Sequence, residues 1–195
     1  MAQGSMTGSL VGVVLATALV GVAVALSFSK GCDEEGGAGG AVQDVKIGGE
    51  WFHLEVAADN DTRMKGLGGR TTESIPLNGG MLFVLPFAQT TQFVMRDCPA
   101  DLDIIYLSPE GRVLTTYEMK AEPARGLDEG PVGDWAQQHA GSAKYEERLS
   151  KQYKSRYPTQ FVVELRGGRL RTLRAPIKEG DKIDLPYAEW KKRVR

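Results

Sequence analysis

The sequence predicts a mainly β protein: a compact antiparallel β-sandwich or barrel-like domain with a few short helices, plus one N-terminal transmembrane helix. Three observations lead to this prediction. Short runs of apolar and β-branched residues recur along most of the chain. Turn signals rich in Gly, Pro and Asn separate these runs, which is typical of antiparallel sheets rather than βαβ units. An uncharged apolar run near the N-terminus predicts the transmembrane helix.

The apolar run covers nineteen residues, 10–28, without a charged side chain. As a helix it spans about 28 Å, close to the ~30 Å hydrocarbon core of a membrane. No Lys or Arg precedes it and no clean cleavage site follows it, so we expect a retained single-pass anchor rather than a cleaved signal peptide. Lipidation of Cys32 is the alternative, because the small residue Gly31 precedes this cysteine.

The remaining organisation follows from composition. We expect a short N-terminal tail over residues 1–9, a Gly-rich flexible linker over 29–41, and one β domain over 42–195. A helical insertion at about 124–154 interrupts this domain. With 24 basic and 25 acidic residues the net charge is −1, which gives no global argument for nucleic-acid binding. Basic residues do gather after Arg166, but no aromatic side chains alternate with them, so no nucleic-acid partner is expected.

The individual elements can be placed from the pattern. The expected strands cover residues 45–47, 51–56, 81–85, 91–95, 103–107, 113–117, 160–165 and 170–173. Helices are expected from Asn60 or Asp61 to Leu67, over 142–153, and over 184–192. The run 81–85 is apolar at every position, which predicts a central strand buried on both faces.

Asp103 interrupts an otherwise apolar strand, where an ionised carboxylate is costly unless it is paired. Arg70, Arg96 and Arg63 are nearby candidates for a partner, because a guanidinium offers a bidentate fork. One interpretation is an internal Asp–Arg clamp that fixes the loop after Leu67 to the sheet. The other is a polar pocket in which Arg70, Arg96 and Asp103 meet a ligand, with Met95 beside them.

Four ordered blocks carry a resemblance to a known family. They are Gly66-Leu67 with Arg70, Gly80 to Phe83, Phe93 with Met95, and Leu102 to Ile104. In this order and spacing the chain resembles the bacterial and archaeal domain of unknown function 192, over most of residues 45–186. The resemblance implies a fold but no activity. Because family members often carry export signals, it also favours a domain outside the cytoplasm, on the periplasmic side of a bacterial membrane.

The chain departs from the family pattern at several block positions. Gly68 stands where Met is usual, Val94 where Trp is usual, and Asp101 where Pro is usual, and Arg96-Asp97-Cys98 replaces Lys-Asn-Thr. If the strand around Val94 lines a ligand pocket in the family, the loss of an aromatic side chain changes the shape of that pocket.

The remaining motifs favour no particular chemistry. The two histidines, His53 and His139, lack metal-ligand spacing with Cys98, so no metal is expected. No phosphate-binding loop or nucleophile elbow is present, and no cofactor is expected.

The leading hypothesis is therefore a non-catalytic, membrane-tethered β domain that binds a small molecule, a glycan or an envelope protein. One alternative is an enzyme that uses Asp103 with Arg70 or Arg96 on an anionic substrate. The other is an accessory subunit that docks onto a membrane complex through its helical insertion.

Overall fold

The computed structural model describes residues 40–130, 143–149 and 153–194, all within the unit Ala38–Arg195. No helix within these described ranges is long and apolar enough to cross a membrane. The expected tail 1–9, anchor 10–28 and Cys32 lie outside the described residues, as do most of the linker and part of the 124–154 insertion.

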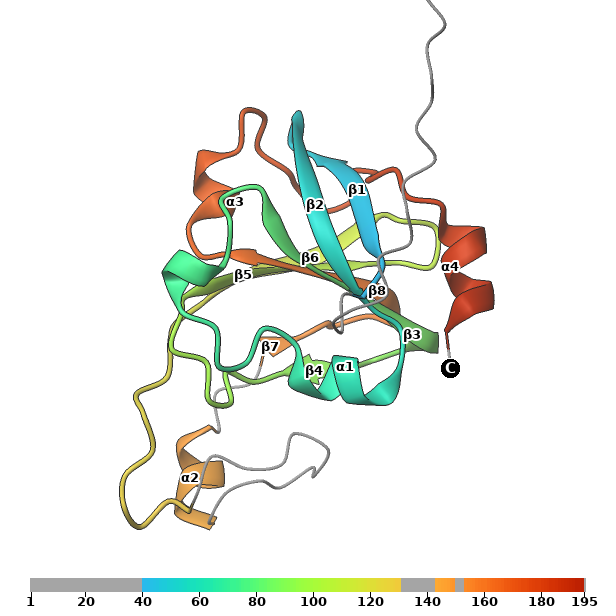
Figure 1. The fold of residues 1–195 in the computed structure, drawn as a ribbon. Helices are drawn as coiled ribbons and strands as arrows, with labels where there is room; N and C mark the ends of the chain where they lie inside the picture. Colours follow the sequence, from blue (N-terminus) through green and yellow to red (C-terminus); the bar gives the residue numbers. More distant parts are fainter. Residues whose placement is uncertain (1–39, 131–142, 150–152, 195) are drawn as a thin grey trace, which may run out of the picture. The chain divides into compact units, whose positions relative to one another are not determined.

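The described residues form a mainly β fold with a few short helices, as predicted (Figure 1). The strands are β1 (Val42–Ile47), β2 (Glu50–Ala57), β3 (Gly79–Gln89), β4 (Gln92–Phe93), β5 (Leu102–Leu107), β6 (Val113–Met119), β7 (Tyr153–Lys154) and β8 (Thr159–Arg166). The helices are α1 (Asn60–Lys65), the 3-10 turn η1 (Thr72–Ser74), α2 (Ala143–Arg148), α3 (Arg169–Thr172) and α4 (Tyr187–Arg193).

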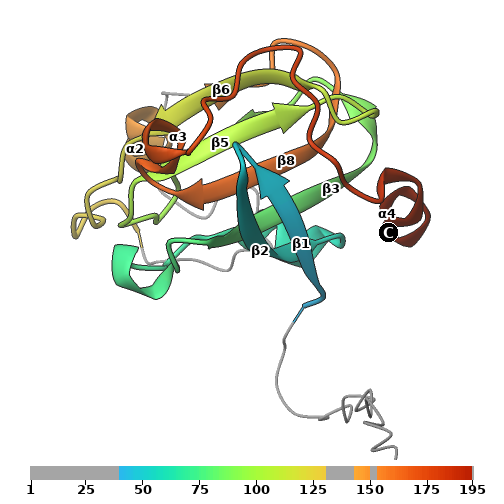
Figure 2. The ribbon, with the colours of Figure 1, turned by 90° about the horizontal axis from the view of Figure 1, so that it is seen from above.

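Six strands form one sheet in the order β1-β2-β3-β8-β5-β6, and β4 pairs with β7 in a separate two-stranded sheet. Figure 2 shows β8 between β3 and β5. The prediction of a wholly antiparallel fold is wrong for one pair, because β2 and β3 run parallel. Parallel neighbours need a long crossover, and the segment that contains α1 and η1 provides it. The described strands do not close into a barrel, since β1 and β6 remain edges.

The hairpin of β1 and β2 turns at Gly48 and Gly49, which both have positive φ angles, 55° and 81°. Two consecutive residues with positive φ match the turn that best fits the twist of a two-residue hairpin. Gly48 is needed for a second reason: a Cβ there would lie 2.6 Å from the carbonyl oxygen of Ala175.

The helices differ from expectation at two places. The first expected helix is present, but its N-cap is Asp59, whose Oδ1 accepts a hydrogen bond from the Thr62 amide at 2.9 Å. The stretch 170–173, expected as a strand, instead belongs largely to α3. Its first turn forms because the Asp103 carboxylate accepts a hydrogen bond from the Leu170 amide, an interaction between residues far apart in sequence.

The sheet is buried on both faces by two separate apolar clusters. On one face, side chains such as Phe52, Ile105 and Phe161 pack with Trp190 of α4. On the other, Phe83 and Ile104 pack with residues outside the sheet such as Leu67. The prediction that 81–85 is a central strand buried on both faces is confirmed. Alternation along the central strands β8 and β5 therefore assigns each side chain to one of two covered faces.

Two adjacent residues of β5 test this arrangement. Ile104 and Ile105 are both fully buried but belong to opposite clusters. We expect Ile104→Ala and Ile105→Ala each to lower the free energy of unfolding by about 2–5 kcal/mol, since both leave a cavity in packed surroundings. Denaturant unfolding measures the loss, and Trp51→Ala at an exposed position serves as the control. A small loss for either isoleucine would show that its face of the sheet is open to solvent.

Candidate functional site

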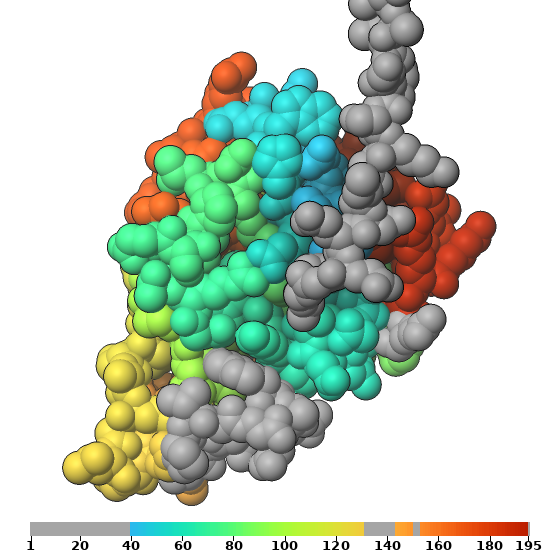
Figure 3. All heavy atoms as spheres, in the orientation of Figure 1, coloured from blue at the N-terminus to red at the C-terminus, as the bar shows by residue number. Residues whose placement is uncertain are grey.

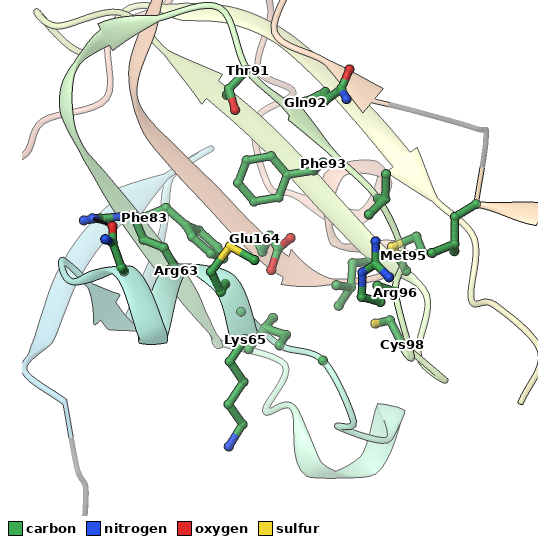
Figure 4. A pocket seen from close by; sticks show the side chains of 18 of the residues that line it. Arg63, Lys65, Phe83, Thr91, Gln92, Phe93, Met95, Arg96, Cys98 and Glu164 are labelled. Carbon is green, nitrogen blue, oxygen red and sulfur yellow. Dashed lines mark hydrogen bonds between the residues drawn. The ribbon is translucent and has the colours of Figure 1, made fainter. Parts of the chain in front are cut away.

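A cavity of about 870 Å³ lies against one face of the sheet. Its walls come from α1 and the loop after it, from β3, from the segment around β4, and from α2. Figure 3 shows α1 and the following segment (teal) at the molecular surface on this side. The lining includes Gly66 and Leu67 together with Phe83, Phe93, Met95 and Glu164, and Figure 4 shows the last four of these side chains.

Glu164 lies on β8 in the middle of the sheet, where its neighbours are Met81 on β3 and Ile104 on β5. Alternation along β8 directs Val163 and Leu165 to the opposite apolar cluster, so that the Glu164 side chain points into the cavity (Figure 4). The residue is only 5% exposed. An ionisable side chain at the centre of a buried sheet is the most unusual feature of this fold.

The hydrogen bonding of Glu164 is incomplete. The backbone of Leu67 hydrogen-bonds the carboxyl group, but the Oε2 atom is buried without a hydrogen-bond partner. Burial disfavours the charged form and raises the pKa of Glu164 from 4.5 to about 8. A buried, unsatisfied oxygen in a cavity indicates a binding or catalytic group, because such atoms are rare in packed interiors.

Gly66 keeps the space over this carboxyl group open. Its φ angle is 52°, a conformation that favours glycine. A Cβ at this position would lie 3.2 Å from Cζ of Phe83 and 3.7 Å from Oε2 of Glu164. The glycine of the first family block therefore both ends α1 and leaves room beside the buried acid.

Aromatic and apolar side chains form the interior wall. The rings of Phe83 and Phe93 meet edge to face with their centroids 5.0 Å apart, and Phe93 makes a similar contact with Tyr106 at 5.9 Å. Val94, where the family resemblance implies Trp, also lines the cavity. The smaller side chain at this position leaves space that an aromatic ring would fill.

The two arginines in the lining are held by groups of the protein. Arg63 donates hydrogen bonds to the carbonyl oxygens of Ala58 at 2.7 Å and Val84 at 3.0 Å, which fixes α1 against β3. Arg96 forms a bidentate pair with Glu146 of α2, with Nη2 2.8 Å from Oε2. Each arginine thus joins two elements of the cavity wall.

A buried ionic network attaches α2 to the loop after β4. Arg125 pairs with Asp97, its Nε lying 2.6 Å from Oδ1, and both side chains are almost fully buried. The Tyr145 hydroxyl hydrogen-bonds Asp97 at 3.0 Å. The guanidinium groups of Arg125 and Arg148 lie over the Tyr145 ring at 4.1 and 4.9 Å. Cation–π contacts and paired charges therefore position this wall of the cavity.

The predicted candidate residues are not brought together. Met95 and Arg96 line the cavity, whereas Arg70 pairs with Glu55 through two hydrogen bonds of 2.5 and 2.6 Å. Asp103 lies on the opposite face of β5 and accepts the Leu170 amide at 2.6 Å. The predicted clamp of Asp103 with either arginine is therefore wrong: strand alternation directs the Asp103 carboxylate away from the cavity, where it caps α3 instead.

Cys98 lines the cavity but is buried. Burial raises the pKa of its thiol to about 12, so at neutral pH the thiol is protonated and a poor nucleophile. The cysteine also has no companions for metal binding. Within residues 40–130, 143–149 and 153–194, no group of three or more His, Cys, Asp or Glu side chains could hold a metal ion.

Glu164 is absent from the candidates predicted above, although the sequence carries a signal for it. It stands inside the otherwise apolar run from Phe161 to Leu165, just as Asp103 stands inside its own strand. The same argument about a costly buried charge applies to both acids. Strand alternation places each acid on a face, but it does not say which face borders a cavity.

The geometry thus defines a β domain with a cavity whose inner wall is apolar and whose base carries one buried acid. A family profile described as DUF192, an uncharacterised conserved family, matches residues 43–185. The chain belongs to this family. A search of curated proteins found no match.

Two solved structures are similar to this chain. A crystal structure from Sinorhizobium meliloti 1021, described as that of a candidate transcription regulator, has a TM-score of 0.51 at 23% identity and covers 76% of this chain and 97% of that one. A protein of unknown function from Novosphingobium aromaticivorans DSM 12444 has a TM-score of 0.48 at 22% identity, and covers 73% of this chain and 82% of its own. At such identities the first similarity supports the fold alone.

The pH dependence of the free energy of unfolding tests whether Glu164 is protonated in the folded protein. Because its folded pKa of about 8 lies above the ordinary 4.5, the unfolded chain releases this proton first, and this residue destabilises the fold as pH rises from about 4.5 to about 8. We expect the free energy of unfolding of Glu164→Gln to equal that of the wild type near pH 4. At pH 9 it should be higher than that of the wild type by on the order of 4 kcal/mol. Chemical denaturation at both pH values measures this difference.

The exposed acid Glu147 provides the control for this experiment. Glu147→Gln is expected to leave the pH dependence of unfolding unchanged. A stability difference between Glu164→Gln and the wild type that stays constant from pH 4 to pH 9 would contradict a buried, protonated Glu164.

Proposed function

We propose that this protein is a non-catalytic binding module that takes a small molecule into the Glu164 cavity and is tethered to a membrane by residues 10–28. One observation carries the proposal: the buried Oε2 atom of Glu164 has no hydrogen-bond partner and faces a cavity of about 870 Å³. That volume lies within the range of about 300–1,000 Å³ that small-molecule sites occupy.

The energetic argument starts from the unsatisfied oxygen. Leaving a buried polar atom without a partner costs roughly 1–3 kcal/mol, which a ligand group that hydrogen-bonds Oε2 would recover. Around this atom the wall is aromatic and apolar, so the rest of such a ligand gains by leaving water. A single central polar group surrounded by apolar walls is the usual composition of a small-molecule pocket.

Among the expected ligand classes the cavity favours a small molecule. The apolar side chains of Phe83, Phe93 and Met95 favour a ligand with an apolar body, and polar lining residues such as Asn60, Thr91 and Gln92 can contact its polar groups. An envelope protein would need a wide exposed surface rather than a cavity. The enzyme hypothesis based on Asp103 has no support from the geometry, since that carboxylate lies on the other face of the sheet.

The accessory-subunit hypothesis depends on the helical insertion. Two charged side chains of α2 contact residues outside the insertion: Glu146 pairs with Arg96, and Arg148 donates to Glu122 at 3.1 Å. Glu146 and Leu149 also line the cavity. These contacts support a role for α2 in shaping the binding site.

A matched pair of phenylalanine variants tests ligand binding. Phe93 lines the cavity, whereas Phe87 is 63% exposed and outside the lining. We expect Phe93→Ala to lower at least tenfold the affinity of the 195-residue chain for every small molecule that binds it. The reason is that the ring contributes a large part of the apolar wall. Phe87→Ala should leave these affinities unchanged. Ligand-observed NMR with a panel of aromatic fragments, sugars and peptides provides the binding data.

Two outcomes would contradict the binding proposal. If only peptides or oligosaccharides bind, and Phe93→Ala does not affect them, the cavity is not the site. If no panel member binds while the chain turns over a substrate, the module is an enzyme.

The membrane tether is tested separately by fractionation. We expect the full chain to stay with bacterial membranes after carbonate extraction, and a chain lacking residues 1–28 to become extractable, since nineteen uncharged residues match the membrane core. Protease added to spheroplasts should digest the domain if it lies outside the cytoplasm. A protected domain in intact spheroplasts would place it on the cytoplasmic side.

A further inference from the structure

The chemistry of the cavity interior narrows the ligand class. We propose that the site binds an organic ammonium ion, a primary or secondary amine attached to an aromatic or similarly sized apolar body, whose N–H group hydrogen-bonds Oε2 of Glu164. This inference rests on the proposed binding function and names the kind of ligand that the same cavity would take.

The carboxyl group of Glu164 at the base of the cavity favours a ligand that carries a hydrogen-bond donor. The Leu67 backbone hydrogen-bonds the carboxyl group of Glu164. The Oε2 atom has no hydrogen-bond partner in the structure. This oxygen is therefore available to a ligand. Once the carboxyl group is ionised, its oxygens only accept hydrogen bonds, so the ionised form pairs with a donor on the ligand.

The apolar wall also favours a positive charge. The ring of Phe83 lies close to the carboxyl group, as the positions around Gly66 show: a Cβ there would be 3.2 Å from the ring and 3.7 Å from Oε2. Phe93 stands edge to face against Phe83 at 5.0 Å. Aromatic faces attract cations, most strongly where water is excluded. The thioether of Met95, also in the lining, is polarizable and adapts to an irregular ligand.

The cations of the cavity wall do not oppose this charge. Arg63 directs its guanidinium to the carbonyl oxygens of Ala58 and Val84. Arg96 is paired with Glu146. Lys65 is exposed, and Figure 4 shows its ammonium group pointing away from Glu164. An entering ammonium ion thus meets arginines that are directed to other groups of the protein, with one acid at the base of the cavity.

Binding of an ammonium ion changes the protonation of Glu164. In the empty cavity the acid is neutral at pH 7, because its pKa is about 8. When the ammonium ion binds, the carboxyl proton passes to solvent, and a carboxylate–ammonium pair remains in the cavity. A neutral ligand would instead accept a hydrogen bond from the carboxyl O–H group and release no proton. Proton release therefore separates the two ligand classes.

Other titratable groups surround Glu164. Burial, and after it the charge of Glu164, raises the pKa of Cys98 and of Tyr106, so both stay protonated at neutral pH. The charged residues that line the cavity from α1, the β4 segment and α2 are Asp61, Arg63, Lys65, Arg96 and Glu146. Comparison of the wild type with Glu164→Gln separates proton release at Glu164 from proton release at these groups.

The experiment compares three probes of one shape: 2-naphthylmethylamine, 2-naphthylmethanol and 2-naphthoate. Each is titrated calorimetrically into the 195-residue chain in lipid nanodiscs, with empty nanodiscs as the blank, in two buffers of different ionisation enthalpy. We expect the amine to bind most tightly and to release about one proton per molecule near pH 6.5. Its affinity should rise about tenfold from pH 6 to pH 7.

Two variants locate the effect. Glu164→Gln should lower the affinity for the amine at least tenfold and abolish proton release. The affinity for the alcohol should stay within about threefold of the wild-type value. Asp103→Asn changes a second buried acid, on the opposite face of the sheet. It should alter neither the affinity for the amine nor the number of protons released. Proton release is measured on the wild type, so the test does not depend on the folding of Glu164→Gln.

The outcomes separate this inference from the function on which it rests. Tighter binding of the alcohol or the naphthoate than of the amine, weakened by Phe93→Ala, would overturn the ammonium assignment and leave the binding function intact. Amine binding without proton release would also overturn it. Failure of all three probes and of the wider panel to bind would overturn both.

Discussion

The burial of β8 is the constraint on which the rest of the structure depends. This strand lies between β3 and β5 in the middle of the sheet and is covered on both faces. One face must pack with the cluster that includes Phe161 and Trp190, and the other borders the cavity. An acid on such a strand is largely removed from bulk water. Its protonation, its incomplete hydrogen bonding and its availability to a ligand all follow from this position.

The elements that cover this face of the sheet are attached by directed interactions as well as by apolar packing of residues such as Leu67 and Met95. Arg63 holds α1 to the carbonyl oxygens of the sheet region, and Arg96 holds α2 through Glu146. The buried pair of Asp97 and Arg125 fixes the connecting loop. Breaking one partner of a buried ion pair leaves an uncompensated charge. These contacts therefore fix the position of the cavity walls.

Part of this architecture was predictable from local pattern. The apolar runs indicated most strands of the main sheet, and the apolar run 81–85 indicated a strand covered on both faces. The parallel pairing of β2 with β3 was not predictable, because turn signals do not reveal which strand a crossover reaches. The start of α3 was missed for a similar reason, since its cap, Asp103, is distant in sequence. The candidate site was predicted only for Met95 and Arg96.

The sequence by itself determined the family, most strands and turns, and the presence of two acids inside apolar strands. Only the tertiary structure decided which acid borders a cavity and which caps a helix. The physical reason is that alternation fixes the face of a side chain within its own strand, whereas the groups that cover that face come from distant segments. Asp103 accepts a hydrogen bond from the Leu170 amide on a packed face. Glu164 borders a cavity that is also lined by Gly66 and by the rings of Phe83 and Phe93.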